Sequence, residues 1–78
     1  MISADDLLAA KFKAVLYADM ARGGWLQVRQ CVEHPRLTMV HQAEHRGAPV
    51  QRQFFVDDQE VESLEAAARS LNENPSSA

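Results

Sequence analysis

The sequence predicts an α+β protein in which two helices pack on one face of a three-stranded antiparallel meander, in the order α-β-β-β-α. Three observations support this fold class. Apolar residues recur at helical spacing over residues 5–22, polar and apolar residues alternate between residues 25 and 56, and helical spacing returns from residue 61. A chain of 78 residues is enough for one domain, which we place at residues 1–72.

The first predicted helix, residues 5–22, is apolar nearly all round. Ser3 is suited to cap its start and Gly23-Gly24 to end it. A helix of this kind is normally covered on more than one side, and one small sheet cannot cover both sides. The sequence therefore predicts self-association of the chain as a homodimer. The predicted contact surface consists of four apolar side chains, mostly small: Leu7, Ala14, Ala18 and Ala21.

Three strands are predicted next, at residues 25–33, 37–45 and 50–56, because these stretches alternate in polarity. Pro35 and Pro49 mark the turns between them. If the apolar sets of all three strands face the helices, one polar residue of each strand shares that face. These residues are a candidate pocket or subunit contact, or they simply reach solvent near an edge of the sheet: Gln30, His41 and Arg52. The opposite face holds a candidate partner-binding patch, which scattered exposed residues would also explain: Trp25, Arg29, Val40 and Phe55.

The end of the chain predicts a polar turn, a second helix and a tail. Residues 57–60 form the turn, and Ser63 is placed to cap the helix. The helix has apolar residues at helical spacing: Val61, Leu64, Ala67, Ala68 and Leu71. We expect residues 73–78, which end in Asn-Pro-Ser-Ser-Ala, to be disordered.

Composition limits how such a small domain can be reinforced. A single cysteine, Cys31, excludes an intrachain disulfide and fits a reducing compartment, and oligomerisation is the reinforcement that remains. No apolar run approaches the roughly 18 residues of a membrane span. The acids Asp5 and Asp6 stand where a signal peptide would carry positive charge. We expect a cytoplasmic protein that does not bind a membrane.

The reactive side chains do not form a recognisable catalytic or metal-binding pattern. His41 and His45, on one predicted strand, would lie about 13 Å apart, too far to share an ion. Cys31 and His41 fall on opposite faces in the predicted register, so the thiol lacks an activating base. Gly23-Gly24 follows a helix, whereas phosphate loops follow a strand. We therefore expect no metal, no cofactor and no enzymatic activity.

Charge is distributed unevenly along the chain. Residues 22–53 hold five arginines and two glutamates, a net charge of +3, whereas residues 54–78 have a net charge of −5. The favoured hypothesis is a small, acidic, non-enzymatic homodimer that binds another macromolecule. One alternative is a nucleic-acid-binding regulator that uses the sheet, although a pI near 5.5 argues against it. Its contact residues would be Arg29, Arg36, Arg46 and Arg52 with Trp25 and Phe55. Another alternative is an inhibitor or adaptor of a larger protein complex.

Overall fold

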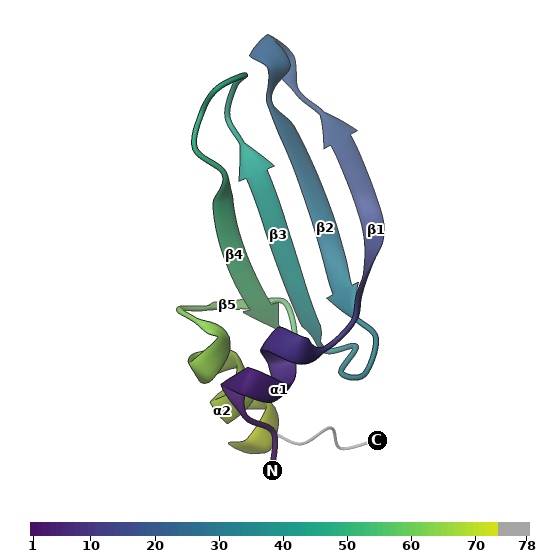
Figure 1. Ribbon diagram of the computed structural model, residues 1–78, viewed down its shortest axis with the longest axis vertical. Helices are drawn as coiled ribbons and strands as arrows, with labels where there is room; N and C mark the ends of the chain where they lie inside the picture. Colours follow the sequence, from purple (N-terminus) through teal and green to yellow (C-terminus); the bar gives the residue numbers. More distant parts are fainter. Residues whose placement is uncertain (74–78) are drawn as a thin grey trace.

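The computed structural model describes residues 1–73 and shows a five-stranded antiparallel sheet with two helices at one end (Figure 1). The strands are hydrogen-bonded to one another in chain order. The elements are α1 (Ala4–Ala9), β1 (Phe12–Asp19), a 3₁₀ turn (Ala21–Gly23), β2 (Trp25–Cys31), β3 (Leu37–Ala43), β4 (Gln51–Val56), β5 (Gln59–Val61) and α2 (Leu64–Glu73). The α+β class is confirmed, but the sheet has two strands more than predicted.

The prediction of one helix over residues 5–22 is wrong. The capping box between Ser3 and Asp6 starts a helix that ends at Ala9, and the chain then becomes the edge strand β1. The carbonyl of Lys11 accepts a hydrogen bond of 2.8 Å from the N–H of Val32, next to the start of β1. Pairing with β2 satisfies the backbone groups on one side of residues 12–19 without covering their side chains. The apolar side chains that motivated a buried helix are therefore largely exposed.

A tight connection joins β1 to β2 where the sequence predicted the end of a helix. The N–H of Met20 donates to the carbonyl of Gly24 at 2.8 Å, which closes the hairpin. A Cβ atom on Gly24 would lie 2.5 Å from the carbonyl oxygen of Glu44, so this position has no room for a side chain. The two glycines thus allow the β1–β2 connection to pack against the end of β3.

The acidic segment after β4 forms a second hairpin that the sequence analysis described only as a polar turn. Asp57 and Asp58 both have positive φ, 53° and 67°, the backbone shape of a two-residue type I′ hairpin. Arg36 binds the carboxylate of Asp57 through Nε and Nη2. The short strand β5 follows, so Val61 belongs to the sheet and not to the second helix.

The second helix begins as predicted. The N–H of Ala66 donates to the hydroxyl of Ser63 at 3.1 Å, which caps α2. The helix extends to Glu73, the first residue of the predicted tail. Residues 74–78 of that tail lie outside the described part of the chain.

The helices and the sheet share one small core. Both helices contribute to it. The sheet contributes Cys31, Leu37 and Val56, which lie at the end nearest the helices. The helices therefore cover one end of one face, not the whole face as predicted, while the sheet continues beyond them in a molecule 42 Å long. No helix within residues 1–73 has the length and apolar character needed to cross a membrane.

The strand pairing assigns each paired residue to one of two faces, because paired residues point the same way and neighbours along a regular strand alternate. We call the face that carries Cys31, Leu37 and Val56 the helix face, and the other the far face. The register predicted for β2 is wrong by one residue. Leu26 and Val28 lie on the far face. The helix face of β2 carries Trp25, Gln27, Arg29 and Cys31.

Candidate functional site

The part of the helix face beyond the helices carries a cationic and aromatic surface, which we call the basic patch. Four of its residues form one cross-strand row, from β1 to β4, and two lie in neighbouring rows of β2. The row is Tyr17, Gln27, His41 and Arg52, and its neighbours are Trp25 and Arg29. All six side chains are half-buried or exposed. The patch therefore offers contacts from four adjacent strands to a partner.

His41 is held in one orientation within the basic patch. The Nε of Arg52 donates a hydrogen bond of 3.0 Å to Nε2 of His41, which makes Nε2 an acceptor and leaves the ring proton on Nδ1. Burial and the positive charges of Arg52 and Arg29 hold the pKa of His41 below its ordinary value. At neutral pH the imidazole is therefore uncharged, and the two arginines supply the positive charge of the patch.

Arg29 has an incompletely paired guanidinium. It lies on β2 opposite Met39 of β3, and its Nε is buried without a hydrogen-bond partner among residues 1–73. A cationic group that has lost water without gaining an acceptor is costly, and an anion at the other guanidinium nitrogens would offset part of that cost. The arrangement therefore favours an anionic group over Arg29.

Two aromatic rings flank the charged residues. Tyr17 is 61% exposed on the edge strand, and Trp25 is half-buried at the start of β2. Hydrogen bonding to Asp19 and the negative charge of this carboxylate raise the pKa of Tyr17, so the phenol stays protonated at neutral pH. Both rings are therefore neutral. The Asp19 carboxylate, which pairs with Trp25, lies beside them on the same face.

The far face has a different character: it is apolar in the middle and almost uncharged. Its central row runs from Leu16 through Val28 and Val40 to Gln53. Leu26 and Phe55 extend the apolar area on either side of this row. Both helices join the core on the helix face, so neither covers this apolar area.

Several polar side chains of the far face are already hydrogen-bonded. Gln42 donates to Gln53 at 2.6 Å, and Gln53 donates to Glu60 at 3.2 Å, so the three residues form a chain across β3, β4 and β5. Gln30 donates to the carbonyl of Pro35 at 2.9 Å. These amide groups would therefore keep an acceptor if the face were covered.

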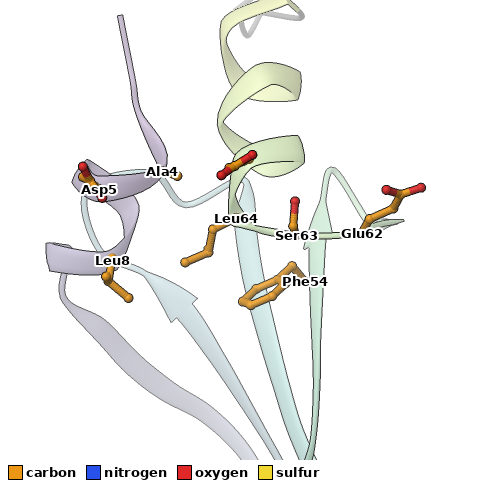
Figure 2. A pocket seen from close by; sticks show the side chains of 8 residues that line it. Ala4, Asp5, Leu8, Phe54, Glu62, Ser63 and Leu64 are labelled. Carbon is orange, nitrogen blue, oxygen red and sulfur yellow. The ribbon is translucent and has the colours of Figure 1, made fainter.

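A shallow cavity of about 480 Å³ lies between α1 and the start of α2. Figure 2 shows Leu8 of α1 on one side of it and Leu64 with Phe54 on the other. Acidic residues line its rim, and the hydroxyl of Ser63 is engaged in capping α2. The cavity therefore has apolar walls and an acidic rim, but its serine is a helix cap.

Cysteine and histidine chemistry finds little support in the described residues. Cys31 and His41 share the helix face, contrary to the predicted register, but they lie two rows apart. Leu37 lies opposite Cys31 on the neighbouring strand and is four residues from His41, so Cys31 and His41 are separated by about 13 Å along the strands. Cys31 is fully buried in the core. Within residues 1–73, no three His, Cys, Asp or Glu side chains are grouped to hold a metal ion.

The residues predicted to act together are only partly brought together. His41 and Arg52 of the candidate pocket are in contact, whereas Gln30 lies on the far face. The candidate partner patch is divided, with Trp25 and Arg29 on the helix face and Val40 and Phe55 on the far face. The reason is the one-residue error in the register of β2.

The predicted self-association set does not form a surface. Leu7 is fully buried in the core, Ala14 and Ala18 point to opposite faces of β1, and Ala21 lies in the 3₁₀ turn. Tyr17 and Leu16, which the structure places on the helix face and the far face, were assigned to the helix by sequence. If residues 12–19 had been predicted as a strand, Tyr17 and Leu16 would both have been candidates for an exposed sheet face.

Comparison with known proteins gives no match for this chain among family models, curated proteins or solved structures.

Proposed function

We propose that this protein is a non-enzymatic binding module that works as a homodimer, in which the far faces of two chains pack together and each basic patch faces outward to bind a macromolecular partner. The observation that carries this proposal is the uncovered far face. Leu16 is 52% exposed there, and Val28, Val40 and Phe55 are only half-buried by their neighbours in the sheet. The helix that first suggested self-association does not exist, but the excess of apolar surface does.

A second copy of the chain suits the far face in chemistry and in size. Interface centres are poor in charged residues, and the middle of this face has none. Five strands of about six residues present roughly 500 Å² in projection, or about 1,000 Å² for two copies, which is near the minimum for a specific interface. Two sheets packed face to face also place their inner side chains in one shared core.

The few charges on the far face are arranged in a self-complementary way. Lys13 on β1 and Glu60 on β5 occupy the same row at opposite margins of the sheet. A two-fold axis parallel to the strands places β1 of one copy over β5 of the other. Each Lys13 then meets the Glu60 of the other chain, so both charges gain a partner of opposite sign.

Sedimentation equilibrium of the wild type and two lysine variants tests the dimer. We expect the wild type to have twice the chain mass of 8.7 kDa at micromolar concentration. Val28→Lys introduces a charge in the middle of the far face and should give a folded monomer. Gln27→Lys places the same side chain one residue away on the helix face and should stay dimeric.

A wild-type monomer at high micromolar concentration would overturn the dimer. So would equal behaviour of the two variants, because the interface would then not involve the far face. Circular dichroism on the same samples establishes that each variant has kept the fold.

A further inference from the structure

We propose that the ligand of the basic patch is single-stranded nucleic acid, with phosphates bound by Arg29 and Arg52 and bases stacked on Tyr17 and Trp25. This inference rests on the proposed function, since it names the partner of the outward face. Sheets that bind single strands combine cationic groups for the backbone with aromatic rings for the bases, and the basic patch contains both.

Positive and negative charges lie in different parts of the fold, although the net charge of the whole chain is −3. Residues 12–31 and 37–53, which form most of the sheet, have a net charge of +3. Their charged residues are Lys13, Arg22, Arg29, Arg46 and Arg52 against Asp19 and Glu44. The other charged residues belong to the helices, β5 and the loops at the helix end, with a net charge of −6. The low pI therefore describes the helix end of the molecule and not the sheet.

Positive charge continues from the patch to the tip of the sheet. The N–H of Arg46 donates to the carbonyl of Arg22 at 2.9 Å, so the two loops that carry these arginines lie together beyond Trp25. A chain of phosphates laid along the helix face would thus pass Arg52 and Arg29 and reach the two arginine loops at the tip, with the Asp19 carboxylate opposite Trp25 as an anionic group on this path. The acidic helix end would repel the same chain, which gives the bound strand a defined limit.

The aromatic rings are spaced for neighbouring contacts. Trp25 is two residues from Gln27, which pairs with Tyr17, so the two rings are diagonal neighbours with Cβ atoms about 7–8 Å apart. Two adjacent bases of a flexible strand can contact two such rings, whereas the bases of a duplex are already stacked on one another. The patch itself is formed by strands, and the helices border it only at the end where Leu7, Leu8 and Leu64 line a small cavity with His41 and Arg52. These features favour a single strand over a duplex.

An acidic peptide is the competing ligand for the same arginines. It would pair with Arg29 and Arg52 but would have no general use for Tyr17 and Trp25. The two ligands therefore differ in their dependence on the rings, and the test compares that dependence.

Binding is measured by anisotropy of a labelled oligo-dT at low salt, with Trp25 fluorescence as a second signal. Equal-length duplex DNA and poly-glutamate are the competitors. We expect oligo-dT to quench Trp25 and to be displaced by neither competitor at equal charge concentration. Tyr17→Ala should weaken binding about 5- to 160-fold, the range for one lost base–ring stack. Arg52→Gln should weaken binding and lower the slope of log K against log salt by about one.

Arg69→Gln on α2 is the matched control for Arg52→Gln, because it removes the same charge from an exposed residue at the helix end. We expect it to leave binding unchanged or slightly tighter. The inference is overturned if folded wild type binds no oligo-dT at low salt, if Arg69→Gln weakens binding as much as Arg52→Gln, or if poly-glutamate displaces the oligonucleotide. Sedimentation of the same samples separates the two proposals. A dimer without oligonucleotide binding refutes only this inference, and a monomer that binds refutes only the dimer.

Discussion

Leu37→Ala is the sharpest test of how little core this fold has. Leu37 is fully buried at the start of β3, where it belongs to the one cluster that joins both helices to the sheet. Truncating a fully buried leucine costs about 3 kcal/mol, from lost transfer energy and the cavity left behind. A core of this size rarely supplies more than about 3–5 kcal/mol. If the wild type is stable by about 4 kcal/mol, about 15% of the variant is unfolded in buffer, against about 0.1% of the wild type.

Urea unfolding followed by circular dichroism measures this loss. The protein concentration is held fixed, because the proposed dimer would make stability depend on it. Leu8→Ala is the matched control. Leu8 is 72% exposed on the same side of the molecule, so the same truncation should change the free energy of unfolding by less than about 0.5 kcal/mol. Equal losses for the two variants would refute the assignment of the core to the helix end of the sheet.

Two further predictions concern the ends of elements. Ser63→Ala removes the hydroxyl that accepts from the N–H of Ala66 and should lower the free energy of unfolding by about 1 kcal/mol. The control Ser70→Ala, inside α2, should not lower it. Equal urea midpoints for the two variants would contradict the cap. Pairing with Arg36 lowers the pKa of Asp57 in the folded protein below its ordinary value of 3.8. The ion pair therefore stabilises the fold fully at pH values above 3.8, and this stabilisation is lost as the pH falls through the folded-state pKa. Asp57→Asn should remove that part of the acid dependence of the urea midpoint, and an unchanged profile would show that the ion pair does not contribute.

The middle of the fold could be predicted because its signals are local. Pro35 and Pro49 separate stretches of alternating polarity, and the strands predicted there begin and end within two residues of β2, β3 and β4. The cap at Ser63 was equally readable. In each case the pattern depends on neighbouring residues and not on distant partners.

The edge strand β1 was missed because a bulge disrupts its alternation. Ala14 pairs with Arg29 and Leu16 with Val28, so one extra residue lies between them. Phe12 and Leu16 then point to opposite faces of a strand although their spacing fits one face of a helix. With an alanine-rich composition added, sequence reasoning favoured the helix. Only the pairing with β2 decides otherwise.

The candidate site was half predicted for a related reason. His41 and Arg52 were placed on one face because the register of β3 against β4 follows the apolar residues that meet the helices. In β2 the rule fails, because the helices cover only the end near Cys31. Leu26 and Val28 therefore lie on the far face. Arg29 lies on the helix face, which was predicted to carry the apolar residues of β2. A register cannot be chosen from hydrophobicity when most of the sheet has no cover.

The same bulge has a consequence for how far assembly can proceed. A sheet with two unpaired margins can recruit further strands and grow into a fibre. The extra residue between Ala14 and Leu16 bends one margin, and the other is the three-residue β5, which carries Glu60. Neither margin offers a long straight template for another chain. The proposed packing of far faces uses the one uncovered apolar face of each molecule, so an assembly built in that way would stop at two copies.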